Sequence, residues 1–108
     1  MEDREFFRIV KETKQVWILF KDNLVHAYSI DNEGLILSVW ESKNNVKLFM
    51  AHQELNDSYK PVCFPVETFI NTFLLKDEMN IEEIFVNNNG LEEKSLCYSK
   101  EEFLKQLE

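Results

Sequence analysis

Two histidines and two cysteines are the residues of this chain best suited to metal or nucleophilic chemistry. Neither His26 nor His52 is followed three or four positions later by a second ligand-type residue, so no metal pair on a helix is indicated. A zinc site built from His26, Cys63 and Cys97 would need three separate strands to converge. A thiol nucleophile needs a paired base and a lowered pKa, and each cysteine has apolar or aromatic neighbours instead. We therefore expect no metal site and two reduced, buried, structural cysteines.

Acidic doublets are the other residues that could do chemistry, because paired carboxylates can act as general acid and base. They fall where turns and helix ends are expected, and charge there usually faces solvent. With only two glycines, the chain has no glycine-rich loop that could hold a phosphate. We predict a protein that is not an enzyme, with no catalytic residues and no cofactor. The doublets are Asp77-Glu78, Glu82-Glu83, Glu92-Glu93 and Glu101-Glu102.

The charge of the chain is unevenly distributed. Twenty acidic and twelve basic residues give a net charge of −8. Residues 76–108 carry −5 of this and residues 1–75 carry −3. Such a chain repels nucleic acid and anionic membranes at long range, so we expect neither as a partner. The excess charge indicates either a solvated surface that keeps the protein soluble or a docking face for a basic protein.

The size of the chain predicts a single domain over residues 1–108. A chain of this length buries roughly two-thirds of its unfolded surface, and the 44% apolar content with nine Phe residues supports a real core. Residues 1–5 lack the basic and apolar regions of a secretory signal, and no apolar run is long enough to span a membrane. We expect a cytoplasmic protein that is a monomer or a homodimer.

Three apolar runs separated by short polar breaks form the centre of the predicted fold. Such runs, punctuated by Asp, Asn and Gly, are typical of consecutive antiparallel strands. In the first run Val16, Ile18 and Phe20 would line one face of a sheet, and Trp17 and Leu19 the other. A sheet that is apolar on both faces must be covered on both, or covered on one and used on the other. The three runs are residues 15–20, 24–30 and 35–40.

The remaining segments complete an α+β pattern. Pro61 and Pro65 predict a short edge strand or an extended connector, because proline lacks the amide hydrogen of a central strand. Asn89-Gly90 favours a hairpin turn, and Ser99 with Glu102 forms a capping box. We predict one α+β domain with an antiparallel or mixed sheet of about five strands, packed with about four helices. Helices are expected over residues 2–14, 46–53, 67–76 and 99–107, and the hairpin over 81–98.

The order of these signals resembles a known family. Val-Trp pairs open the first strand and close the third, and three further motifs follow in the second half of the chain. The chain is similar to the small bacterial proteins of domain of unknown function family 2750, with the resemblance extending over residues 6–107. Ser38 and Glu41 stand where the family pattern has prolines. The resemblance implies no activity, so no catalytic residue is carried over. Its motifs are Val16-Trp17, Val39-Trp40, Tyr59-Lys60-Pro61, Glu67-Thr68-Phe69 and Ile84-Phe85-Val86.

Two classes of function remain open from the sequence. The first is a non-catalytic module that binds a basic protein, as immunity proteins or regulators do, through an acidic rim around aromatic contacts. The second is a small-molecule binder or enzyme that uses an aromatic-lined face with His26. The large aromatic residues are otherwise core, and we expect Trp17 or Trp40 to anchor it. The predicted partner-binding residues are Glu82, Glu83, Glu92, Glu93, Trp40 and Tyr59.

Overall fold

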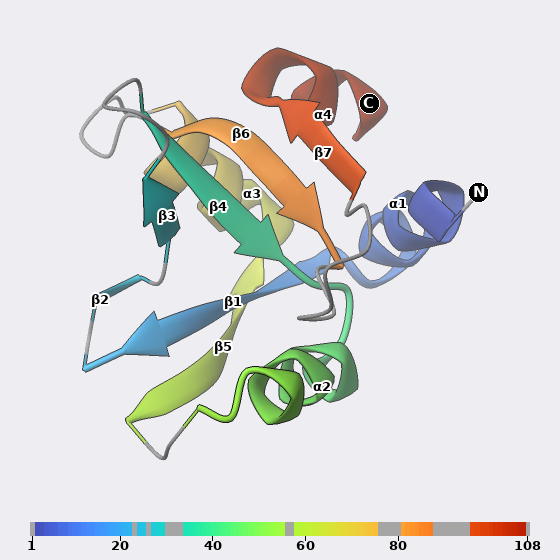
Figure 1. Cartoon of the computed structure of the whole chain (residues 1–108). Helices are drawn as coiled ribbons and strands as arrows, with labels where there is room; N and C mark the ends of the chain where they lie inside the picture. The colour runs from blue at the N-terminus through green and yellow to red at the C-terminus, as the bar shows by residue number, and fades with distance from the viewer. Residues whose placement is uncertain are drawn as a thin grey trace.

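The computed structural model describes residues 2–22, 24–25, 27–29, 34–55, 58–75, 81–87 and 96–107. Four α-helices and seven strands within these ranges confirm the predicted α+β class (Figure 1). In chain order the elements are α1 (Glu2–Thr13), β1 (Gln15–Lys21), β2 (Leu24–Val25), β3 (Ala27–Ser29), β4 (Leu35–Val39), α2 (Lys43–His52), β5 (Tyr59–Pro65), α3 (Val66–Phe69), the π-helix η1 (Ile70–Leu74), β6 (Ile81–Val86), β7 (Leu96–Ser99) and α4 (Lys100–Gln106).

The strands are divided between two sheets, where the sequence predicts one. The first sheet has the order β2-β1-β5 and is antiparallel, and the second has the order β3-β4-β6-β7. The second sheet is mixed, because β4 and β6 run parallel. The strand predicted over 24–30 is the cause of the division. Its first part, β2, pairs with β1, and its second part, β3, pairs with β4.

The prolines of β5 occupy positions that do not interrupt the ladder. Trp17 exchanges both of its backbone hydrogen bonds with Trp40, so its N–H and C=O point away from β5. Its partner in β5, Cys63, is therefore in a non-hydrogen-bonded pair with β1. Pro61 and Pro65 lie two residues on either side of Cys63, so they are in the same class and no ladder bond is lost. Of the two predicted alternatives, a short edge strand or an extended connector, the structure shows an edge strand, with seven residues.

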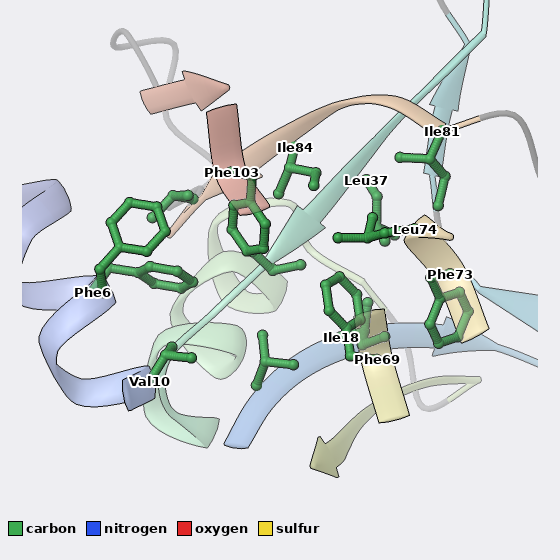
Figure 2. Close-up of a cluster of buried hydrophobic side chains, with 14 residues drawn as sticks. Phe6, Val10, Ile18, Leu37, Phe69, Phe73, Leu74, Ile81, Ile84 and Phe103 are labelled. Atoms are coloured by element: carbon green, nitrogen blue, oxygen red, sulfur yellow. The ribbon is translucent and has the colours of Figure 1, made fainter. Parts of the chain in front are cut away.

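The larger core lies between the two sheets and the helices α1, α3 and α4 (Figure 2). Phe6 and Phe7 of α1 meet edge to face, with ring centroids 5.1 Å apart, and Phe103 of α4 contacts both rings. Phe69 connects this group to the π-helix through Phe73, at 5.6 Å. Burial of these rings is the main stabilising contribution of the core. The other members are Val10, Val16, Ile18, Leu37, Val39, Leu74, Ile81, Ile84 and Val86.

A smaller core covers the opposite face of the first sheet. Leu19 and Trp40 pack there against Val46 and Phe49 of α2, and all four side chains are buried. The ring centroids of Trp40 and Phe49 are 5.2 Å apart. The two apolar faces predicted for residues 15–20 are therefore both covered, one by each core. The prediction that Trp40 anchors the core is confirmed, because none of its surface is exposed.

The helix ends follow the sequence signals. Ser99 Oγ accepts a hydrogen bond from the Glu102 amide, and Glu102 Oε1 accepts one from the Ser99 amide, each at 3.2 Å. This confirms the predicted capping box. Ser42 caps α2 in the same way, accepting from the amide of Asn45. Within the described residues, no helix combines the length and apolar character that crossing a membrane requires.

Candidate functional site

The second sheet presents one face to the larger core and the other face away from it. Leu37 and Val39 of β4 and Ile84 and Val86 of β6 belong to the core. Since side chains alternate along a strand, the residues between them must point to the opposite side. We call this side the outer face. Its residues in β4, β6 and β7 are Ile36, Ser38, Glu83, Phe85, Cys97 and Ser99.

The strand register arranges the outer face in two rows. Glu83 lies between Ile36 of β4 and Ser99 of β7, and Phe85 lies between Ser38 and Cys97. Phe85 and Glu83 are both only partly buried. In Figure 1, α3 lies behind β4 and β6 on the core side, and no labelled helix crosses in front of these two strands. The outer face therefore places a partly exposed aromatic side chain beside a partly exposed carboxylate, whereas Ser38, in the same row as Phe85, is buried.

A hydrogen bond links two side chains of the outer face diagonally. The Cys97 thiol donates to Glu83 Oε1, with an Sγ–O distance of 3.2 Å. Partial burial of the thiol, this hydrogen bond and the negative charge of Glu83 together raise the pKa of Cys97 to about 12. A thiol with such a pKa is protonated at neutral pH and is a poor nucleophile. This arrangement therefore favours non-covalent contacts by the Cys97 side chain over nucleophilic attack by its thiol.

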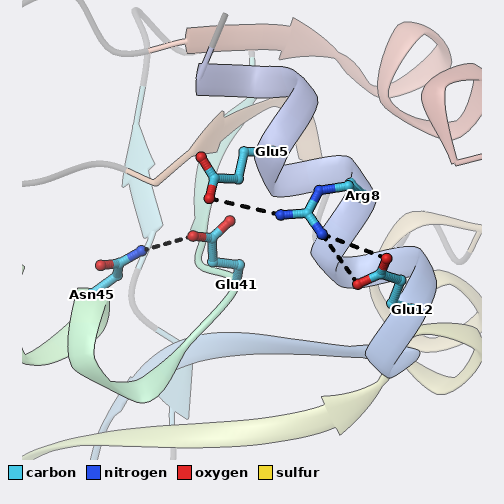
Figure 3. A network of polar contacts seen from close by, with 5 residues as sticks. All are labelled: Glu5, Arg8, Glu12, Glu41 and Asn45. Atoms are coloured by element: carbon cyan, nitrogen blue, oxygen red, sulfur yellow. Dashed lines mark hydrogen bonds and ion pairs between the residues drawn. The ribbon is translucent and has the colours of Figure 1, made fainter.

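Polar contacts close the end of the sheet where β4 and β6 finish. The Glu41 amide donates to Asn87 Oδ1 at 3.2 Å, and the Asn87 amide donates to the Val39 carbonyl at 2.8 Å. Asn45 Nδ2 donates to Glu41 Oε1 at 3.3 Å, whereas the buried Glu41 Oε2 has no hydrogen-bond partner in the described part of the chain (Figure 3). These bonds fix the ends of two parallel strands against the start of α2.

The other polar contacts in Figure 3 belong to the surface of α1. Arg8 bonds Glu12 at 3.3 Å and pairs with Glu5 at 3.8 Å, and all three side chains are more than half exposed. Pairs of this kind contribute about 0.3–0.5 kcal/mol each on a helix. They support α1 but do not form a site.

One comparison with known proteins covers nearly the whole chain. The family model described as Protein of unknown function (DUF2750) matches residues 4–107. The chain belongs to the DUF2750 family. A search of curated proteins finds no match. The function of this DUF2750 protein therefore has to be argued from its own surface.

The residues predicted to bind a partner do not form one surface in the DUF2750 fold. Trp40 is corrected first, because its side chain is fully buried under α2 and cannot touch a partner. Tyr59 is partly buried against the same smaller core, with Lys21 Nζ 5.3 Å from the centre of its ring. Glu82 and Glu83 lie at the start of β6, away from the end at which Trp40 follows β4. Glu92 and Glu93 lie outside the described residues.

The residues considered for metal or thiol chemistry are also separated. Cys63 is in β5 of the first sheet and Cys97 is in β7 of the second, and both are free thiols, which confirms that they are unpaired. The prediction that both are buried is wrong: Cys63 is partly buried and Cys97 is exposed. His26 lies outside the described residues. Among the residues that the structure describes, no three His, Cys, Asp or Glu side chains are grouped to hold a metal ion.

Ile36 and Phe85 are outer-face residues that sequence reasoning missed as site residues, and Cys97 was considered only for metal and thiol chemistry. The signal that could have found them is alternation, because Ile84 and Val86 are core-like and Phe85 stands between them. Alternation alone does not show which residues lie beside Phe85. The pairing of β4 with β6 shows this, and no local pattern in the sequence specifies that pairing.

Proposed function

We propose that this DUF2750 protein is a non-catalytic protein-binding module whose outer face contacts a basic protein. The observation that carries the proposal is the partly exposed Phe85 beside Glu83 on a sheet face that no described helix covers. Aromatic side chains at the centre of a contact, with charge beside them, are the usual anchors of protein interfaces.

The charge of the second sheet supports a basic partner. Glu82 and Glu83 are the charged residues of β3, β4, β6 and β7, and these four strands contain no Lys or Arg. The whole chain carries −8, so long-range attraction also favours a positively charged partner. The outer face is small, which fits a transient contact of roughly 1,200 Å² or less better than a permanent interface.

The state of the cysteines supports a cytoplasmic location for this module. Both thiols are free, and one of them is exposed on the outer face. Unpaired, accessible cysteines are typical of proteins that work in a reducing compartment.

The proposal is tested by recovering partners from a lysate of the organism that encodes the chain. Immobilised wild-type protein is compared with the variants Glu83→Gln and Phe85→Thr, at low and at high salt, and bound proteins are identified by mass spectrometry. We expect a basic partner that is recovered with the wild type, reduced by high salt and reduced by both variants. Threonine keeps the β-propensity of position 85 while removing the ring.

A matched control removes one carboxylate elsewhere. Glu67 is exposed on α3, so Glu67→Gln changes the net charge equally without touching the outer face. Equal loss of the partner with this control would show that net charge alone is responsible and would remove the outer face as the site. Turnover of a metabolite in an unbiased substrate screen, abolished by His26→Ala, would overturn the non-catalytic proposal.

A further inference from the structure

Helix α2 differs in charge from the rest of this acidic protein. Its sequence contains Lys43, Lys47 and His52 and no acidic residue, whereas α1, α3 and α4 each contain at least one carboxylate. The nearest acidic residues in sequence, Glu41 and Glu54, lie beyond its two ends. A basic helix in a chain of net charge −8 marks a local surface with its own preference for partners.

The residues that α2 turns away from the smaller core form two parallel rows. Val46 and Phe49 are buried against the first sheet, and the opposite side of the helix is exposed. Residues four apart lie on the same side of a helix, so each row runs along one exposed stripe. The rows are Lys43, Lys47 and Ala51, and Asn44, Leu48 and His52, and all six side chains are exposed.

Leu48 gives the second row an exposed apolar side chain. It is 52% exposed and is one of three large hydrophobic side chains exposed in the described part of the chain, with Leu24 and Leu75. Lys43 and Lys47 form no hydrogen bond or ion pair with the described residues, so their charges are available to a partner. An apolar residue in one row and two available positive charges in the neighbouring row match an acidic helix that carries an apolar residue.

We propose that the exposed face of α2 is a second docking surface, which receives an acidic amphipathic helix of a partner protein. This surface is separate from the outer face of the second sheet, and the inference does not depend on the function proposed for that face. Leu48 would pack against the apolar stripe of the partner helix, and Lys43 and Lys47 would pair with its carboxylates. The protein would then join two partners of opposite charge.

Other anionic partners fit this surface less well. A membrane-bound amphipathic helix needs a broad apolar face, and here Leu48 and Ala51 are the apolar residues of the exposed stripe. Nucleic acid binding depends on many phosphate contacts, and two lysines on a chain of −8 supply few. A partner helix requires only short-range ion pairs with Lys43 and Lys47. Salt screens the charges elsewhere on the protein beyond a Debye length of about 8 Å, so they affect these pairs little.

The test uses a fluorescein-labelled peptide of Glu and Leu residues with Leu at helical spacing, and binding is measured by fluorescence anisotropy. We expect wild-type protein to bind the peptide and Lys43→Glu/Lys47→Glu to weaken the affinity by about tenfold or more. Leu48→Ser should also weaken it. Glutamate and lysine have similar helix propensities, so the double variant retains α2.

A second pair of lysines provides the control. Lys11 of α1 is exposed, and Lys60 of β5 is exposed on the side of the first sheet opposite to α2. Lys11→Glu/Lys60→Glu should bind the peptide as the wild type does. Absence of peptide binding to the wild type, or an equal loss with the control pair, would overturn the proposal. So would binding of phosphatidylserine vesicles through Lys43 and Lys47 without binding of the peptide.

Discussion

Trp17 and Trp40 join the two sheets through their backbones. The Trp17 amide donates to the Trp40 carbonyl at 2.8 Å, and the Trp40 amide donates to the Trp17 carbonyl at 2.9 Å. The pair is an antiparallel bridge between β1 and the residue that follows β4. Their side chains meet different surroundings, because Trp40 is fully buried whereas Trp17 is only partly buried at the edge of the same smaller core.

This difference predicts unequal costs for removing the two rings. Trp40→Ala should lower the free energy of unfolding by about 3–5 kcal/mol, since it leaves a large cavity between the first sheet and α2. Trp17→Ala should cost less, because part of that ring is in solvent in the folded protein. Urea denaturation of both variants measures the two values. Equal losses would contradict the burial difference.

Replacing Glu54 with glycine should stabilise the protein. Glu54 follows α2 with a φ of 54°, in the left-handed region that costs a residue with a Cβ roughly 1–2 kcal/mol. Glycine avoids that cost but loses more backbone entropy on folding, so a net gain of about 0.5–1 kcal/mol is expected. The measurement is the shift in the denaturation midpoint of Glu54→Gly.

Ala51→Gly is the matched comparison for this prediction. Ala51 lies inside the last turn of α2, where glycine has only the entropic disadvantage and should cost up to about 1 kcal/mol. A loss of stability in both variants would show that the conformation of Glu54 carries no strain.

Local signals predicted most of the elements, but not the long-range pairing of the strands. The helix expected over residues 67–76 is a short α-helix, Val66–Phe69, continued by the π-helix Ile70–Leu74. Asn and Asp residues, the Ser99–Glu102 capping box and the prolines of β5 each act over a few residues, and the structure bears out the helix cap and the edge strand. The split of the second predicted strand depends on which sheet each half joins. That choice is decided by packing against segments far away in the sequence, so no local pattern contains it.

The candidate site was predictable only in part for the same reason. Glu83 was identified by its charge, and the predicted hairpin over residues 81–98 placed the strand of Cys97 beside it. Its neighbour Ile36 comes from β4, which no local pattern pairs with β6. Trp40 was assigned to a partner surface because a large aromatic ring in a strand fits both a core and an interface. Helix α2 packs over Trp40, which makes this ring part of the core and excludes it from an interface. The position of α2 results from tertiary packing, which local sequence patterns do not specify.

The register of β5 predicts opposite outcomes for proline at neighbouring positions. Pro61 is in a non-hydrogen-bonded pair with Leu19, so Pro61→Val should change the free energy of unfolding by less than about 1 kcal/mol. Val62 is paired with Ile18 at a hydrogen-bonded position, so Val62→Pro should cost about 3 kcal/mol or more. Chemical denaturation of both variants tests the register. A large loss with Pro61→Val and a small one with Val62→Pro would mean that it is shifted by one residue.

The pKa of Cys97, raised from its ordinary value of 9.0 to about 12, predicts slow alkylation at moderately alkaline pH. Because the thiolate is the reactive form, the rate of reaction with iodoacetamide should keep rising with pH up to about 12. The protonated thiol is favoured by the folded protein. The resulting contribution to stability is therefore present below pH 9.0 and is lost as the pH rises toward 12.

Glu83→Gln isolates the part of this shift that comes from the carboxylate. The variant removes the negative charge beside Sγ, so the pKa of Cys97 should fall and its alkylation at about pH 9 should become faster. Cys63 serves as the internal comparison, since burial alone raises its pKa and Glu83 is not among the causes. Mass spectrometry of the two cysteine peptides gives both rates from one sample. If Glu83→Gln accelerates both cysteines equally, the cause is a general loosening of the fold, and the contact between Glu83 and Cys97 does not control the thiol.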